Sequence, residues 1–144
     1  MRTVETTASF QAQPDQVWEV IGNPARWGEW LAIHKSWKTP VSDRITEGET
    51  ATAAANVMNM PVTIDWTFEK VDVPRSITMG GTTPVGVTLA LDIRLRRDDG
   101  QATHVDLRVS INGGMIDGPM GAIFKGSIVS ALNKSLKKAG ALIS

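Results

Sequence analysis

Cysteine and histidine, two residue types often used in acid–base and metal chemistry, are absent or rare in this chain. It contains no cysteine and two histidines, His34 and His104. Thiolate nucleophiles, disulfides and cysteine-bound zinc are therefore excluded, and the two histidines are not spaced as metal ligands. His34 lies between Trp30 and Trp37 in the sequence, and it is the one weak candidate for a general base. We therefore expect no metal site, no cofactor and no other catalytic residue.

Charged residues alternate with apolar ones in two later segments and at first sight resemble an active site. Apolar side chains occupy the odd positions of residues 87–95 and 105–111. Successive side chains of a strand point to opposite faces, so the charged residues share the solvent face. They are predicted to form a solvated ladder that contributes little energy: Asp92, Arg94, Arg96, His104, Asp106 and Arg108.

The loop between these two segments sets their register. Both apolar sets are odd-numbered, so the numbers of facing residues must sum to an even number. A three-residue loop at residues 98–100 meets that condition. It predicts that Ile93 faces Val105 on the apolar side. On the solvent side it places Arg94 opposite His104.

The remaining elements follow from period-two alternation and from helix-start signals. The 144 residues contain no linker or internal repeat, so we expect a single domain over residues 1–144. Proline is favoured in the first turn of a helix, and the chain offers it twice before residue 30. The predicted elements are a strand at 3–10, short helices from Pro14 and Pro24, strands at 49–57, 62–69 and 76–81, the two segments above and a long final helix.

The final helix is predicted to be about twenty-five residues long and to start near residues 117–119. The glycine-rich segment before it, residues 112–118, lacks a phosphate-loop pattern and is interpreted as a connection. The helix carries one apolar stripe, which must be buried against the apolar face of the sheet. The stripe comprises Met120, Phe124, Ile128, Ala131, Ser135, Ala139 and Leu142, widened by Ile123, Leu132 and Leu136.

Residues 15–37 contain four of the five tryptophans. Trp18 lies on the apolar side of the first helix, so core packing is its predicted role. Trp27 and Trp30 could each have either of two roles, packing in the core or contacting a ligand in the wall of a cavity. Trp37 ends a polar run and is interpreted as closing a loop onto the domain.

Three short motifs have the form found in one known superfamily. Residues 14–21 read Pro-acidic-x-Val-Trp-x-x-apolar, and residues 23–30 read Asn-Pro-x-x-Trp-x-x-Trp. Residues 66–75 begin with Trp-x-Phe and end with Pro-Arg. In these motifs and in its order of elements the chain resembles the START-like, birch-pollen-allergen-like superfamily (SRPBCC). The most similar subgroup is that of the polyketide cyclase/dehydrase-like proteins, which includes some toxins of toxin–antitoxin pairs.

The resemblance implies an α+β helix-grip fold. In it, a curved antiparallel sheet of six or seven strands wraps around a long C-terminal helix, with two short helices after the first strand. It also implies an apolar cavity between sheet and helix that binds, transports or senses a hydrophobic small molecule, such as a lipid or an aromatic polyketide. Since one fold supports many functions, the chemistry stays open.

A row of alanines is the sequence feature that fits such a cavity. Ala51, Ala53 and Ala55 put only methyl groups on one face of their strand, so large partners such as Trp66 and Phe68 must fill the space or a void remains. With the resemblance, we predict a ligand-binding set of Trp27, Trp30, Ala53, Ala55, Ile64, Trp66, Phe68, Met79, Leu91, Leu107, Phe124 and Ile128.

Charge and hydropathy limit the partners. Fifteen basic residues balance fifteen acidic ones, and no basic stripe occurs, so no nucleic-acid partner is expected. No apolar run is long enough to cross a bilayer, and the first ten residues lack the apolar core of a signal peptide. We therefore expect a cytoplasmic location and no membrane insertion. Two alternatives to a binding protein remain, a polyketide cyclase or dehydratase and a protein-interaction module of toxin-like or co-chaperone-like type.

Overall fold

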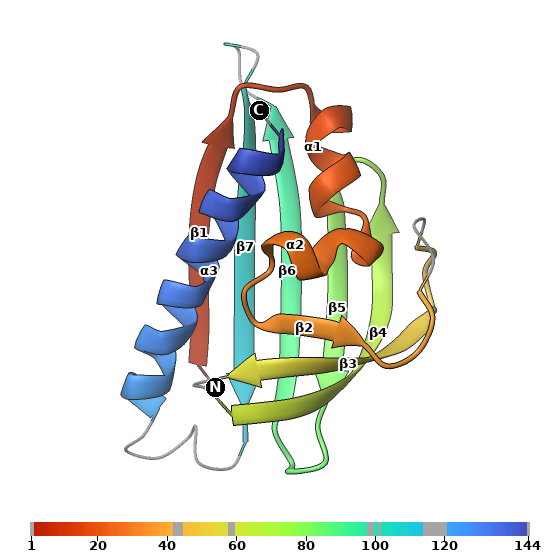
Figure 1. The fold of residues 1–144 in the computed structure, drawn as a ribbon, viewed down its shortest axis with the longest axis vertical. Coiled ribbons are helices and arrows are strands. Elements are labelled where there is room, and N and C mark those ends of the chain that lie inside the picture. Colours follow the sequence, from red (N-terminus) through yellow and green to blue (C-terminus); the bar gives the residue numbers. More distant parts are fainter. Residues whose placement is uncertain are drawn as a thin grey trace.

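The computed structural model describes residues 2–41, 45–57, 60–97, 100, 102–113 and 121–143. Within these ranges, seven strands form one antiparallel sheet in the order β1-β7-β6-β5-β4-β3-β2 (Figure 1). The elements are β1 (Arg2–Phe10), α1 (Pro14–Ile21), the 3-10 turn η1 (Pro24–Arg26), α2 (Trp27–Trp30), β2 (His34–Trp37), β3 (Thr50–Val57), β4 (Met60–Asp72), β5 (Ser76–Thr82), β6 (Thr88–Arg97), β7 (Thr103–Asn112) and α3 (Gly121–Ile143).

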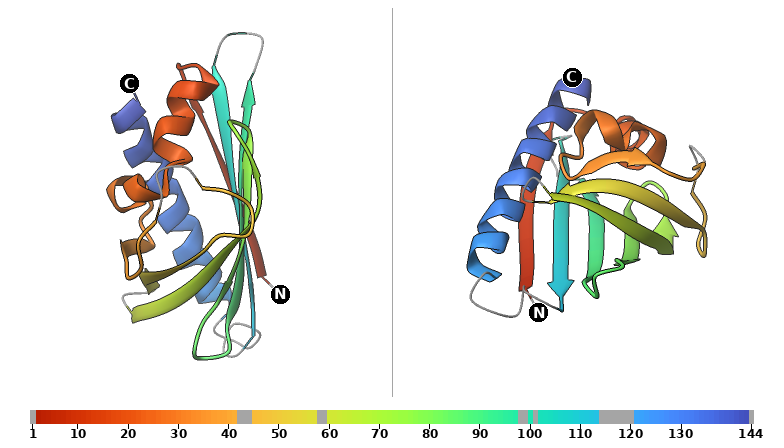
Figure 2. Two further views of the ribbon diagram at one scale, coloured as in Figure 1. Left: turned by 90° about the vertical axis from the view of Figure 1, so that its right-hand side faces the viewer. Right: turned by 60° about the horizontal axis from the view of Figure 1, so that its bottom comes forward.

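The sheet is curved, and the helices lie on its concave side. Figure 2 shows α1, α2 and α3 on the same side of the sheet, with α3 running along β1. The α+β helix-grip fold, the antiparallel sheet, the two short helical elements and the long C-terminal helix are therefore confirmed. The apolar faces of the sheet and of α3 cover each other because neither could be left in water.

The strands alternate between the two faces as predicted. Along β6 and β7 the odd residues are buried, except Arg97 at the end of β6, and the even ones are exposed or partly exposed. Most buried apolar side chains of the described ranges form one core cluster on the concave side. Every strand except the short edge strand β2 contributes buried residues of its inner face to it, among them Val4, Ala53, Ile64, Met79, Leu91 and Leu107.

The register of the β6–β7 pair differs from the predicted one by two residues. Ile93 faces Leu107, and Arg97 still pairs with Thr103, so the connection is residues 98–102. The numbers of facing residues do sum to an even number, as predicted. This condition cannot distinguish between loops whose lengths differ by two residues. The Thr103 hydroxyl donates a hydrogen bond of 2.7 Å to the Ala12 carbonyl, which holds the start of β7 in place. Within the predicted three-residue loop, only Gly100 belongs to the described residues.

Strand β2 was not predicted, because the four residues His34–Trp37 are too short to show a clear alternation. They pair with β3, and the register shifts between His34 and Ser36. Trp37 therefore belongs to an edge strand and not to a loop.

Helix α3 is amphipathic as predicted from Ile128 to Ala139, where Leu132, Leu136 and Ala139 are buried, but the predicted stripe member Leu142 is 37% exposed. The predicted widening of the stripe at Ile123 is wrong, since this side chain is 59% exposed. The first turns of α3 project beyond the part of the sheet that could cover them, as Figure 1 also shows. The predicted start near residues 117–119 and residues 114–116 lie outside the described residues.

Candidate functional site

The concave face brings together the residues that were predicted to bind a ligand. Eleven of the twelve have described side chains, and these are between 0 and 4% exposed. Phe124 lies in α3, but its side chain is outside the described part of the chain. The eleven side chains belong to one core cluster: Trp27, Trp30, Ala53, Ala55, Ile64, Trp66, Phe68, Met79, Leu91, Leu107 and Ile128. A ligand among them would have to displace side chains that now touch one another.

Trp66 supplies the bulk that the row of alanines lacks. It pairs with Ala51 on β3 and with Gly81 on β5. A Cβ atom on Gly81 would come within 2.9 Å of the Trp66 ring, so the ring lies directly over this glycine. The large indole is thus accommodated between two of the smallest residues of the face.

Two tryptophans fix the end of α1. The Trp27 indole N–H donates a hydrogen bond of 3.0 Å to the Ile21 carbonyl, and Trp30 donates one of 3.1 Å to the Val20 carbonyl. The last carbonyls of a helix have no partner within the helix, so these two bonds satisfy groups that would otherwise be buried without one. Trp27 and Trp30 are therefore anchors between α1 and α2, and their N–H groups are already occupied.

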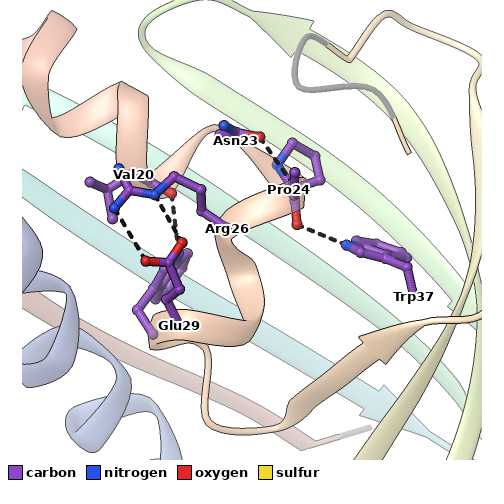
Figure 3. A network of polar contacts seen from close by, with 8 residues as sticks. Val20, Asn23, Pro24, Arg26, Glu29 and Trp37 are labelled. Atoms are coloured by element: carbon purple, nitrogen blue, oxygen red, sulfur yellow. Dashed lines mark hydrogen bonds and ion pairs between the residues drawn. The ribbon is translucent and has the colours of Figure 1, made fainter. Parts of the chain in front are cut away.

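A third indole extends this network to β2. Trp37 donates a hydrogen bond of 2.8 Å to the carbonyl of Pro24, as Figure 3 shows. Beside it, Arg26 and Glu29 form an ion pair with an N–O distance of 3.0 Å. Both charged side chains are open to solvent over a third or more of their surface, so this pair contributes little to stability.

Aromatic rings surround Trp27 within the core. Its ring centroid lies 6.5 Å from that of Trp30, 6.3 Å from His34, 5.6 Å from Trp37 and 6.3 Å from Phe68. Edge-on and tilted contacts of this kind stabilise aromatic clusters beyond the area they bury. Trp27 thus connects α2 with both β2 and β4.

His34 is the buried titratable residue of this cluster. Its ring lies 4.7 Å from the ring of Trp37, and the residue is 8% exposed. Burial lowers the pKa of His34 to about 4, because the charged form loses its hydration. At neutral pH the imidazole is uncharged, so one ring nitrogen donates and the other accepts.

Two polar groups of the core have no hydrogen-bond partner in the described part of the chain, the His34 ring and the Trp66 indole N–H. In the same ranges every fully shielded side-chain nitrogen or oxygen has a partner. The nitrogens of His34 and Trp66 therefore keep some access to a water-sized space. No sequence pattern marked Trp66 as a donor, because period two gives only the face on which a side chain lies.

The predicted charged ladder lies on the convex face, away from this core. Arg96 donates to Asp106 at 2.6 and 3.0 Å, and the hydrogen bond from Arg96 lowers the pKa of that carboxyl. Because of the corrected register, Arg94 faces Asp106, and His104 faces Arg96. A hollow of about 290 Å³ in this face is lined by both signs of charge, including Glu5, Asp92, Arg94, Asp106 and Arg108. The ladder is thus solvated, as predicted.

Trp18 is less buried than predicted. It is half-buried and lines an open groove of about 650 Å³ together with Ile45 and Val73. The ring still packs against the core cluster, but within the described ranges it makes no ring contact with Trp27.

The family described as "Polyketide cyclase / dehydrase and lipid transport" matches residues 1–141. The chain belongs to this family. The match agrees with the predicted superfamily and subgroup, and it covers both the sheet and α3.

Relatives of the chain occur in Mycobacterium tuberculosis. The uncharacterized protein Rv1546 is 28% identical over 138 residues, which cover 96% of this chain and 96% of that protein. The toxin Rv0910 is 26% identical over 125 residues, which cover 86% of this chain and 85% of the toxin.

Solved structures of the family fold are similar over the whole chain. The Zhui aromatase/cyclase from Streptomyces sp. R1128 superposes with a TM-score of 0.77 at 18% identity, covering 99% of this chain and 93% of that one. Protein CV1439 from Chromobacterium violaceum gives a TM-score of 0.72 at 13% identity, covering 99% and 98%. At such identities the likeness shows the fold alone.

Among the described helices, none combines the length and apolar character that crossing a membrane requires.

Proposed function

We propose that this protein binds an apolar small molecule, a lipid or an aromatic polyketide, between the concave face of the sheet and α3. The observation that carries the proposal is the make-up of that face. Its described side chains are apolar apart from a few polar groups, and two of these, on His34 and Trp66, have no partner within the described ranges. Small-molecule sites typically combine an apolar wall with a few such groups. Membership in a family that includes lipid transport supports the same function.

Binding at this face requires the core to open. The lining side chains are almost fully shielded from solvent, so α3 or α2 must shift before a ligand can enter. The gain would come from apolar surface removed from water, about 0.8 kcal/mol for each buried methylene of the ligand. A ligand of lipid or polycyclic size offers enough such surface to offset the rearrangement.

Binding is better supported than proton transfer. A general base works best when its pKa lies near the working pH. Burial holds the pKa of His34 at about 4, so its imidazole is a weak base at neutral pH. Its uncharged ring is better suited to orient a ligand through a hydrogen bond.

Intrinsic tryptophan fluorescence would test the proposal. The purified protein is titrated with palmitic acid, 1-hexadecanol, cholesterol and phenanthrene, with isothermal titration calorimetry as a second readout. We expect a saturable change with at least one of them, because Trp27 and Trp66 lie at the proposed site. If neither fluorescence nor heat responds to any probe while the protein is folded, the proposal is wrong.

Two neighbouring alanines of β3 provide a matched pair of variants. Ala53 is fully buried and faces the core, whereas Ala54 is partly exposed on the other face of the strand. Ala53→Leu adds bulk where the ligand would lie and should weaken binding at least tenfold, while Ala54→Leu should leave it within about twofold. Circular dichroism shows whether both variants remain folded. Equal affinities for two folded variants would place the ligand elsewhere.

A further inference from the structure

The charge of the concave face limits what it can bind. Among the described residues, the buried side chains that are polar or charged are His34, Thr103 and Ser135. No lysine, arginine, aspartate or glutamate is buried in these ranges. The face therefore offers an anionic ligand no buried positive charge from the described chain.

Two of the three buried polar side chains are already engaged. The Thr103 hydroxyl donates to the Ala12 carbonyl. The Ser135 hydroxyl donates to the Ala131 carbonyl at 2.7 Å and accepts from the Ala32 N–H at 2.8 Å. This leaves His34 and the Trp66 indole N–H for a ligand.

His34 and Trp66 lie along one aromatic wall. The ring of Trp27 contacts both His34 and Phe68, at 6.3 Å between centroids in each case. Phe68 and Trp66 are two residues apart on the same strand and are both buried on its inner face. A flat or elongated ligand that lies along this wall would therefore pass both His34 and Trp66.

The hydrogen-bonding capacity of these two groups selects a chemical class. An indole N–H can only donate, so it requires an oxygen that accepts. An uncharged imidazole can donate to or accept from a hydroxyl, but it cannot neutralise a carboxylate. Burying a carboxylate without a counter-charge is costly, and the acid would have to take up a proton first.

We propose that the ligand is uncharged at neutral pH and carries a hydroxyl or carbonyl oxygen that accepts a hydrogen bond from Trp66 or His34. The site would take sterol-like, phenolic or alcohol ligands and would discriminate against free fatty acids and other carboxylates. This inference rests on the proposed function, since it specifies the ligand class of the same site.

Three ligands with one ring skeleton test it: phenanthrene, 9-phenanthrol and phenanthrene-9-carboxylate, titrated by calorimetry at about pH 7.5. The phenol should bind roughly three- to tenfold tighter than phenanthrene, the gain expected from one hydrogen bond. The carboxylate should bind at least about tenfold more weakly than the phenol. The pair 1-hexadecanol and palmitate should show the same preference for the uncharged member.

Indole N–H resonances in a ¹H–¹⁵N spectrum locate the contact. The Trp66 signal, assigned by its loss in Trp66→Phe, should shift with the phenol and much less with phenanthrene. Trp66→Phe should bring the phenol-to-phenanthrene affinity ratio closer to one, whereas Trp18→Phe, in the open groove beside α1, should keep it.

The outcomes separate this inference from the proposed function. Carboxylates that bind as tightly as their uncharged counterparts would overturn the inference and leave the proposed function standing. Equal affinities for phenanthrene and phenanthrol, with no shift of the Trp66 signal, would overturn the role of the polar groups. If neither these five compounds nor cholesterol binds, the proposed function itself fails.

Discussion

Trp66 lies so close to Gly81 across the β4–β5 pair that the glycine has no room for a side chain. A Cβ atom there would be 2.9 Å from two carbons of the indole and 2.8 Å from a methyl group of Ile64. Such distances are shorter than van der Waals contact, so either the ring or the strand would have to move. This glycine therefore sets where the Trp66 ring lies on the concave face.

Gly81→Ala should lower the free energy of unfolding by about 1–3 kcal/mol, the usual cost of adding a methyl group to a packed core. Urea denaturation measures the change. Gly126→Ala is the matched control, because a Cβ at this exposed position of α3 meets nothing within 4 Å. Alanine is the better helix former, so the control should gain up to about 1 kcal/mol. A Gly81→Ala protein as stable as the parent would contradict the observed packing of Trp66.

The stability of the protein should depend on pH through His34. Burial lowers the pKa of His34 from 6.5 to about 4, so between these values the unfolded chain binds more protons than the folded one. The stabilising contribution is complete above about pH 6.5 and is lost as the pH falls toward 4, by on the order of 3 kcal/mol. Thermal unfolding at several pH values should show this slope. His34→Gln, which cannot titrate, should flatten it; an unchanged slope would assign the effect to carboxylates.

The indole bonds at the end of α1 predict an unequal response of two tryptophans. Trp30→Phe removes the donor to the Val20 carbonyl and leaves that buried group without a partner, so we expect a loss of about 2–4 kcal/mol in unfolding free energy. Trp18 makes no such bond within the described ranges and is half-buried, so Trp18→Phe should cost less than about 1 kcal/mol. Denaturant titrations followed by circular dichroism compare the two. Similar losses would mean that ring volume matters more than the hydrogen bond.

Alternation in the sequence was sufficient to predict which face each predicted strand buries and that the middle of the long helix covers it. It could not provide the β6–β7 register, since Ile93 satisfies parity opposite either Val105 or Leu107. Strand β2 has four residues, too few for a period, and depends on pairing with β3. Local pattern carries no information about such long-range pairing.

The candidate site was predictable only as a list of apolar residues. The turn at Pro24 brings α2 back toward α1. Only because of this turn can Trp27 and Trp30 donate their indole N–H groups to carbonyls of α1. The polar groups of Trp66 and His34 are free because no neighbouring donor or acceptor of the described chain forms a hydrogen bond with them. Both properties arise from three-dimensional contacts and not from spacing along the chain.

The convex ladder should matter neither for stability nor for ligand binding. Arg96 is largely exposed although its two hydrogen bonds to Asp106 are well formed. Exposed pairs of this kind usually contribute less than about 1 kcal/mol. Arg96→Gln should therefore shift the unfolding free energy by less than that, with less difference at high salt, and should leave the affinity for any ligand of the concave face unchanged. A tenfold loss of affinity would move the binding site to the convex face.

Ser135 connects α3 to the segment between α2 and β2, and this contact should limit how readily the core opens. Its hydroxyl accepts the Ala32 N–H at 2.8 Å from a fully buried position. Ser135→Ala leaves that N–H without its partner, which should cost about 1–3 kcal/mol. If ligands reach the concave face by displacing α3, the variant should also show faster hydrogen exchange along α3 and faster ligand association. Ser130→Ala, at an exposed position of the same helix, should change neither rate. Faster exchange without faster association would mean that ligands enter by a path that does not involve α3.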